Sequence, residues 1–177
     1  PAGAQGGGIV NQEGQKSEMI SAAADVLLVL TACVGAMGAA TRPAPADIVG
    51  RASVIDGDTI EIGGQRVRFF AIDAPESSQL CRAENKPYRC GQQSVFALAD
   101  KIGERTVRCL ERDIDRYQRV VAACYLGKED LGGWLVKEGM ALAFRRYSLD
   151  YVAEEDEARV AKRGVWRGEF QPPWEWR

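Results

Sequence analysis

The chain has 177 residues, a hydrophobic fraction of 46% and a formal net charge of −2, which suit one folded domain with an additional segment. Because acidic and basic residues nearly balance, any surface that binds polyanions needs arginines gathered locally on one face. The sequence contains no histidine. This excludes Ser-His-Asp and Cys-His nucleophile systems and His-ligated zinc, so acid–base chemistry falls to Asp, Glu, Tyr, Lys or Cys.

Residues 1–46 are interpreted as an N-terminal extension, and residues 47–177 as the folded domain. Residues 1–18 are polar and rich in glycine, whereas residues 20–40 are small and apolar apart from Asp25. The apolar stretch matches the hydrophobic core of a signal peptide in length and is short for a membrane span. We therefore expect an exported protein, periplasmic or secreted.

The processing of this extension is open between two routes. Leu30–Cys33 resembles a bacterial lipobox, which would make Cys33 the lipid-anchored first residue of the mature protein. The other route is ordinary cleavage after a small-residue site such as Ala44–Ala46. A basic segment ahead of the apolar stretch is missing if translation starts at Met19, which counts against both routes.

Hydrophobic periodicity and turn residues predict the elements of the folded domain. Gly63–Gly64 predicts a tight turn, and Gly103, Gly139 and Gly164 predict helix ends. In chain order we expect strands at 48–55, 59–62 and 65–72, a loop at 75–88, a helix at 90–103, strands at 106–111 and 120–126, a helix at 131–138, a strand at 140–144, a helix at 152–163 and an aromatic tail at 170–177 that packs on the body. This order predicts an α+β fold, mainly β, in which a five-stranded barrel carries about three flanking helices.

Four cysteines of the folded domain form two local pairs in the sequence. Cys109 and Cys124 lie symmetrically about a turn near residue 116, and Cys81 and Cys90 flank one loop. Together with the expected export, this predicts the disulfides Cys81–Cys90 and Cys109–Cys124. The alternative is four buried free thiols; a zinc site is disfavoured because the chain has no Cys-x-x-Cys pair.

Two aspartates are candidates for a metal site. Asp58 lies at the start of the second strand and Asp73 at the end of the third, and these ends are neighbours in an antiparallel hairpin. Carboxylate oxygens are the ligands that Ca²⁺ and Mg²⁺ prefer. Taken alone, Asp56–Thr59 is better explained as a plain turn, because Asp-Gly favours turns.

Arg68 is an unusual residue for the middle of a strand. Alternation places it on one face with Arg66, Phe70 and Ile72. A guanidinium beside apolar side chains needs an anionic partner, which is either a phosphate or the carboxylate of a structural ion pair.

Four other side chains carry suitable chemistry. Glu76 follows a proline outside the strand and could accept a proton from water, or it is a solvated loop charge. Arg119 could bind phosphate oxygens in bidentate fashion, or it is a surface arginine at a hairpin end. Tyr117 and Tyr147 could stack on bases, or they could pack in the core.

Taken together, these motifs resemble the staphylococcal nuclease (thermonuclease) family. The resemblance covers residues 48–167, nearly all of the expected folded domain. The matching segments are Val54–Thr59, Arg68–Glu76, Asp115–Arg119, Trp134–Gly139 and Gly164–Trp166.

The resemblance implies an OB-fold barrel and Ca²⁺-dependent hydrolysis of DNA and RNA, preferably single-stranded, by a monomer without a protein partner. By the same matching, each site residue acquires a role. Asp58, Asp73 and the backbone carbonyl of Ala74 would ligate Ca²⁺, Glu76 would be the general base, Arg68 and Arg119 would bind the scissile phosphate, Arg116 and Tyr117 would lie beside a neighbouring phosphate, and Tyr147 would stack near a base.

The sequence departs from the family pattern at two places. Gln118 stands where the family usually has glycine, and a positive φ there would strain glutamine and could displace Arg119. The loop 77–88 is this chain's own version of the active-site loop. Two alternatives to a nuclease therefore remain: an OB-fold module that binds single strands without cleaving them, and an exported interaction domain whose carboxylates hold a structural Ca²⁺.

Overall fold

The computed structural model describes residues 2–3 and 47–177. The predicted export signal, Cys33 and the proposed cleavage sites lie outside the described residues. Among the residues that are described, no helix has both the length and the apolar character needed to cross a membrane.

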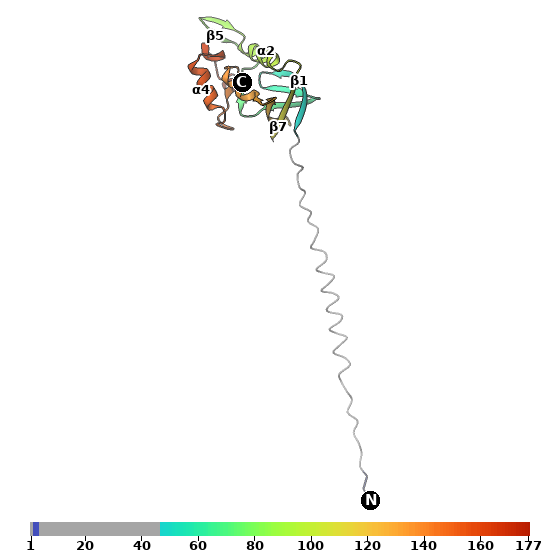
Figure 1. Ribbon diagram of the computed structural model, residues 1–177. Helices are drawn as coiled ribbons and strands as arrows, with labels where there is room; N and C mark the ends of the chain where they lie inside the picture. Colours follow the sequence, from blue (N-terminus) through green and yellow to red (C-terminus); the bar gives the residue numbers. More distant parts are fainter. Residues whose placement is uncertain (1, 4–46) are drawn as a thin grey trace. The chain divides into compact units, whose positions relative to one another are not determined.

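Five strands form a closed barrel (Figure 1). They are β1 (Ile48–Asp56), β2 (Thr59–Ile62), β3 (Gln65–Phe69), β7 (Thr106–Ile114) and β8 (Val120–Leu126). Neighbours pair in antiparallel fashion in the order β3-β2-β1-β7-β8, and a parallel pairing between β3 and β8 closes the ring. The predicted α+β class and five-stranded barrel are confirmed.

Alternating side chains fill the interior of the barrel. In β3, Val67 and Phe69 are buried and their neighbours are more exposed, as the sequence pattern predicted. The turn between β2 and β3 uses Gly63 and Gly64, both with positive φ, the conformation that glycine adopts at little cost. The resulting core includes Ile60, Val67, Phe69, Val107, Val120 and Ala122.

The third strand is shorter than predicted, and this changes the geometry at the rim. The chain turns after Phe69, where Ala71 has a φ of 57°, and resumes as β4 (Ile72–Asp73). Strand β4 leaves the barrel to pair with β10 (Leu142–Ala143). The prediction that Arg68 shares one strand face with Phe70 and Ile72 is therefore wrong, because the strand has ended before those residues.

The predicted loop at 75–88 contains a short hairpin. Strands β5 (Cys81–Ala83) and β6 (Lys86–Tyr88) pair across Glu84 and Asn85, which both have positive φ. The helix that follows, α2 (Cys90–Ile102), ends at Gly103 as predicted.

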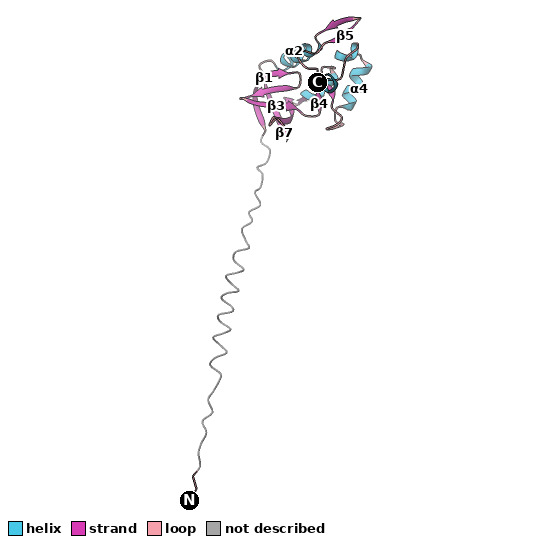
Figure 2. Cartoon of the chain, turned by 180° about the vertical axis from the view of Figure 1, so that it is seen from behind, coloured by secondary structure: helices cyan, strands magenta, loops and turns pink. Residues whose placement is uncertain are grey.

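Helix α4 (Val152–Val160) lies to one side of the barrel strands (Figure 2), and further short elements complete the domain. They are β9 (Glu129–Asp130), α3 (Leu131–Lys137), the 3₁₀ helix η1 (Gly164–Arg167) and α5 (Pro173–Trp176). Asp130 caps α3, because its Oδ1 accepts bonds from two backbone N–H groups, at 2.9 Å from Gly132 and 3.3 Å from Gly133. Helix α4 is shorter than predicted, ending at Val160.

Both predicted disulfides form. Cys81–Cys90 joins β5 to the first residue of α2, and Cys109–Cys124 joins β7 to β8 inside the barrel. Paired disulfides in a small domain are typical of proteins in oxidising compartments.

Candidate active site

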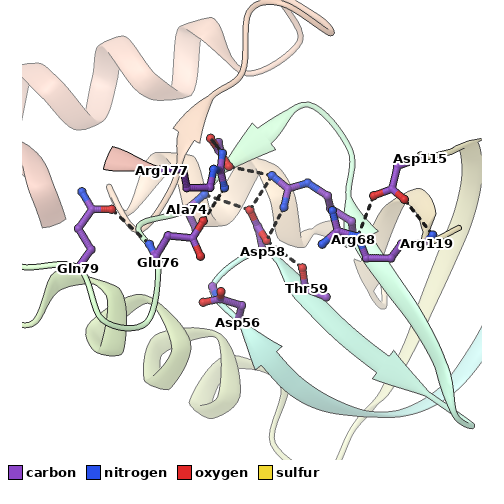
Figure 3. A network of polar contacts seen from close by, with 12 residues as sticks. Asp56, Asp58, Thr59, Arg68, Ala74, Glu76, Gln79, Asp115, Arg119 and Arg177 are labelled. Atoms are coloured by element: carbon purple, nitrogen blue, oxygen red, sulfur yellow. Dashed lines mark hydrogen bonds and ion pairs between the residues drawn. The ribbon is translucent and has the colours of Figure 1, made fainter. Parts of the chain in front are cut away.

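Two buried aspartates meet at the rim of the barrel. Asp58 precedes β2 and Asp73 ends β4, and their exposed fractions are 4% and 0%. Arg68, which pairs with Thr59 across β2 and β3, reaches both: its Nη1 lies 3.1 Å from Asp58 Oδ1 and its Nη2 lies 2.8 Å from Asp73 Oδ1. The structure thus brings the predicted carboxylates together on one arginine (Figure 3).

Tight packing fixes the position of Asp58. Its Oδ1 accepts a hydrogen bond from the hydroxyl of Thr59 at 2.9 Å, and its Oδ2 accepts one from the backbone N–H of Ala74 at 3.2 Å. Gly57 allows this approach, because a Cβ at that position would overlap with Ser94 and Ala74. The Asp-Gly-Asp turn is therefore a packed feature of the site and more than a surface turn.

Burial and mutual repulsion disfavour the ionised form of two of these carboxylates. Burial, followed by repulsion from Asp58, raises the pKa of Asp73 above its usual value, although Arg177 and Arg68 act in the opposite direction. Burial also raises the pKa of Asp56, with further contributions from Asp58 and Glu76. A nearby cation would relieve this repulsion.

The donor set has the chemistry of a site for a hard divalent cation. Asp58, Asp73 and the carbonyl of Ala74 offer oxygen ligands only, which suits Ca²⁺ or Mg²⁺. Within residues 2–3 and 47–177, however, no three acidic or cysteine side chains already stand in the geometry of a metal site.

Glu76 lies beside this pair, on the loop that follows β4. Its backbone N–H donates to Gln79 Oε1 at 3.3 Å, and its side chain keeps an exposed fraction of 26%. The first turn of α2 packs directly on the loop, because a Cβ at Gly91 would overlap with the carbonyl oxygen of Glu76. Glu76 is thus held near Asp73 with access to solvent.

Arg119 belongs to a separate group on the turn before β8. Asp115 organises this turn: its Oδ2 binds Arg119 Nε at 2.7 Å, and its Oδ1 accepts the backbone N–H groups of Tyr117 at 2.8 Å and Arg119 at 2.9 Å. Figure 3 shows Arg68 turned toward Asp58 and Arg119 turned toward Asp115. Gln118 has a φ of 62°, the strained conformation that the sequence comparison raised as a possibility.

The three residues expected at the edge of the site are exposed. Tyr117 and Tyr147 each have an exposed fraction of 65%. The guanidinium of Arg116 lies 4.9 Å from the centre of the Tyr117 ring, and Tyr147 packs on Phe144 with a centroid distance of 5.3 Å. The structure thus divides the expected residues into a connected carboxylate network, the Asp115 turn and an aromatic cluster around Phe144.

Sequence reasoning missed Arg177. Its Nη2 lies 2.5 Å from Asp73 Oδ2, and its Nη1 lies 2.5 Å from Glu76 Oε1. The aromatic tail was correctly expected to contact the body, since Pro173 is buried and Trp174 packs on Phe144. No periodicity or motif in the tail indicates which of its residues reaches the site.

The closed barrel, with its carboxylates and arginines at one rim, defines an OB-fold domain of the nuclease type. The family model described as "Staphylococcal nuclease homologue" matches residues 66–168. The chain belongs to this family.

Several named relatives are similar to the chain. "Succinoglycan biosynthesis protein ExoI" of Rhizobium meliloti is 40% identical over 126 residues, which cover 69% of this chain and 66% of the relative. "Uncharacterized endonuclease" of Haemophilus influenzae is 35% identical over 120 residues, covering 64% and 62%. "Micrococcal nuclease" of Shigella flexneri is 34% identical over 154 residues, covering 76% and 83%.

The chain therefore spans slightly less than two thirds of the length of the first two relatives. The second and third relatives carry the names of an endonuclease and a nuclease.

Proposed function

We propose that this protein is a calcium-dependent nuclease that hydrolyses phosphodiester bonds within DNA and RNA. The observation that carries the proposal is the meeting of Asp58, Asp73, Arg68 and Glu76 at one rim of the barrel. Two buried carboxylates suit a divalent cation, an arginine suits a phosphate, and a partly exposed glutamate suits a water molecule.

In this proposal Asp58, Asp73 and the carbonyl of Ala74 hold Ca²⁺. When bound, the ion supplies charge neutralisation at a phosphate oxygen and a position for water. Arg68 then exchanges its carboxylate partners for phosphate oxygens. The buried carboxylates lose one guanidinium and gain a divalent ion, so the exchange does not leave them uncompensated.

Glu76 acts as the general base. Water attacks phosphorus in line with the departing oxygen, forming a new P–O bond while the ester P–O bond breaks. Glu76 takes the proton of the attacking water, and the departing oxygen is protonated from solvent. Arg68 and Arg119 bind the equatorial oxygens, where negative charge grows in the transition state.

The exposed groups around this centre fit a flexible strand. We propose that Arg116 and Tyr117 contact a neighbouring phosphate and that Tyr147 stacks on a base. Stacking contributes about 1–3 kcal/mol for each base and needs a base that is free to leave its partner, which favours single-stranded substrates. We propose a monomer, since every named group comes from one chain.

We further propose that the protein is exported and folds in an oxidising compartment. The two disulfides support this location. Lipid attachment through Cys33 is the more specific form of the proposal, and mass spectrometry of the mature N-terminus from a bacterial host would test it.

Digestion of labelled single-stranded DNA tests the proposed activity. We expect cleavage with Ca²⁺, none with chelator, and a loss of at least about 100-fold in the Glu76→Ser variant. The matched control is Glu104→Ser, which removes an exposed carboxylate whose partner is Arg51, outside the site. Cleavage that survives either chelator or Glu76→Ser would contradict the proposal.

A binding module without catalysis is the second candidate, and two observations favour it. Gln118 strains the turn that carries Arg119, and Arg177 engages both Asp73 and Glu76. The same digestion distinguishes the two candidates, because a binding module would shift the mobility of the DNA in a gel without cutting it at any Ca²⁺ concentration.

A further inference from the structure

Arg177 engages the two carboxylates that the proposed mechanism needs most. Its guanidinium bridges Asp73 Oδ2 and Glu76 Oε1, both at 2.5 Å, while Arg68 takes the other oxygen of Asp73 at 2.8 Å. Both oxygens of the buried aspartate are therefore paired with arginine. Arg177 therefore places a positive charge against the aspartate that a cation would bind, and it occupies one of the two carboxylate oxygens of Glu76.

The segment 169–177, here termed the C-terminal strap, is anchored next to the site. Gln79, which is fully buried, donates from its Nε2 to the carbonyl of Gln171 at 2.7 Å and accepts the N–H of Glu76 through its Oε1 at 3.3 Å. One side chain thus links the strap to the loop that carries the proposed base. Trp174 adds an aromatic contact with Phe144 at 5.6 Å.

The tip of the strap is held less firmly than its base. The side chain of Arg177 has an exposed fraction of 40%, whereas that of its partner Asp73 has 1%. Helix α5, which precedes Arg177, has only four residues, and the backbone N–H of Arg177 reaches Pro173 at 3.3 Å. Short helices of this kind contribute little stability by themselves, so α5 adds little to the ion pairs that hold the Arg177 side chain.

Charge repulsion also favours a site that holds either Arg177 or the divalent cation, but not both at once. Arg177 and a divalent cation would both lie against the carboxylate of Asp73. Two cations at that distance repel each other in a partly buried site, where water screens them poorly. Arg68 has an alternative partner in the proposed substrate phosphate, whereas the ion pairs of the Arg177 side chain are with Asp73 and Glu76.

We propose that the C-terminal strap is an autoinhibitory element in which Arg177 competes with the divalent cation and sets the cation concentration at which the site becomes active. The proposal rests on the proposed function insofar as it takes Asp58 and Asp73 as metal ligands. Binding of the cation releases Arg177 from Asp73 and frees Glu76 in the same step.

Calorimetric titration of Ca²⁺ into the full chain without nucleic acid tests the competition. We expect Arg177→Gln to lower the Kd for Ca²⁺ by about tenfold, within the usual range for coupled sites. Arg177→Lys should lie nearer to the wild type, because it keeps the charge but loses the fork that bridges two carboxylates. The matched control is Arg51→Gln, which removes the same charge from a side chain that is 75% exposed and paired with Glu104.

Hydrogen exchange gives a second readout that does not depend on activity. The backbone N–H groups of Trp176 and Arg177 bond to the carbonyls of Pro172 and Pro173. If cation binding releases the tip of the strap, saturating Ca²⁺ should accelerate exchange at these two amides. Exchange in β1 should stay unchanged.

The outcomes separate this inference from the proposed function. Equal Ca²⁺ affinity in the wild type and Arg177→Gln, or weaker binding in the variant, would overturn the inference while leaving a Ca²⁺-dependent nuclease intact. Binding only in the variant would support the inference in its strongest form. Failure of both proteins to bind Ca²⁺ would overturn the inference together with the assignment of the metal site.

Discussion

The two halves of the candidate site are built differently. The carboxylate half consists of the buried Asp58 and Asp73 and the partly buried Arg68, all on or next to strands. The turn half, Arg119 with Asp115, stands on a connection whose other side chains are exposed. The carboxylate half contributes to the stability of the fold, whereas the turn half can change without disturbing the core. Substitutions in the carboxylate half should therefore lower both activity and stability, whereas substitutions in the turn half should lower mainly activity.

The largest expected effect is a loss of both activity and stability on substitution of Arg68. Arg68→Ala should lower turnover by about 100-fold or more, because a phosphate-binding donor is lost. It should also destabilise the fold by about 3 kcal/mol, because Asp58 and Asp73 lose their shared partner while buried. Arg119→Ala should lower turnover similarly but destabilise by only about 1 kcal/mol, since its partner keeps two backbone hydrogen bonds.

Urea denaturation at pH 7 and single-turnover cleavage measure the two quantities. Arg51→Gln serves as the control for loss of a surface arginine. Equal destabilisation by the two alanine variants would break the distinction between the halves of the site.

Gly91→Ala should have the next largest effect, on the support of Glu76. The added Cβ overlaps with the carbonyl oxygen of Glu76, so either the loop or the first turn of α2 must move. Overpacking of this kind costs about 1–3 kcal/mol. We expect a lower thermal midpoint and weaker cleavage, whereas Gln92→Ala, one residue further along the same helix, should leave both nearly unchanged. A Gly91→Ala variant as active as the wild type would show that the position of Glu76 is not critical.

The sequence predicts the barrel well because local signals specify it. The alternation in β3 and the glycine pair at 63–64 together determine a hairpin, and its pairing of Thr59 with Arg68 places Arg68 beside Asp58. The pairing of the cysteines followed from the same local symmetry, and both disulfides were confirmed.

The features that the sequence does not predict depend on distant contacts. Strand β4 departs from the barrel because β10, about 70 residues later, offers a partner, which no pattern in residues 65–73 reveals. Arg177 is separated from Asp73 by 104 residues, and its role depends on the buried Gln79 and on the packing of the strap. The β5–β6 hairpin was missed because Glu84 and Asn85 are less typical of a tight turn than a glycine pair.

A smaller effect is expected at Asp115, and it depends on pH. Burial tends to raise the pKa of Asp115, but the backbone and side chain of Arg119 and the N–H of Tyr117 lower it below its usual value. The stabilisation from this carboxylate is therefore present above the unfolded value of about 3.9 and is lost as the pH falls through the lower folded value. Asp115→Asn should destabilise by about 1 kcal/mol at pH 7 and reduce turnover by about tenfold.

Denaturation at a series of pH values checks the sign of this effect. The difference between the wild type and Asp115→Asn should shrink as the pH falls toward 2. The nearby Asp113→Asn is the control, since its carboxylate makes a local bond to the N–H of Ile114 and does not contact Arg119. A difference that grows on acidification would show that Asp115 does not favour its ionised form in the folded protein.

The smallest effect should be a gain in stability, and it concerns the strained residue of the turn half. Gln118 has a φ of 62° and donates its N–H to the carbonyl of Asp115 at 3.0 Å, so the strain persists alongside an intact turn. A left-handed conformation costs a non-glycine residue about 1–2 kcal/mol, and part of this is recovered as glycine despite its greater freedom in the unfolded chain. Gln118→Gly should therefore raise the free energy of unfolding by about 0.5–1 kcal/mol, while Gln118→Ala should give no gain because it keeps the strain. Urea denaturation measures both variants, and cleavage assays show whether relief of strain also improves the position of Arg119. A Gln118→Gly protein that is less stable than the wild type would mean that the glutamine side chain makes a contribution larger than the backbone strain it imposes.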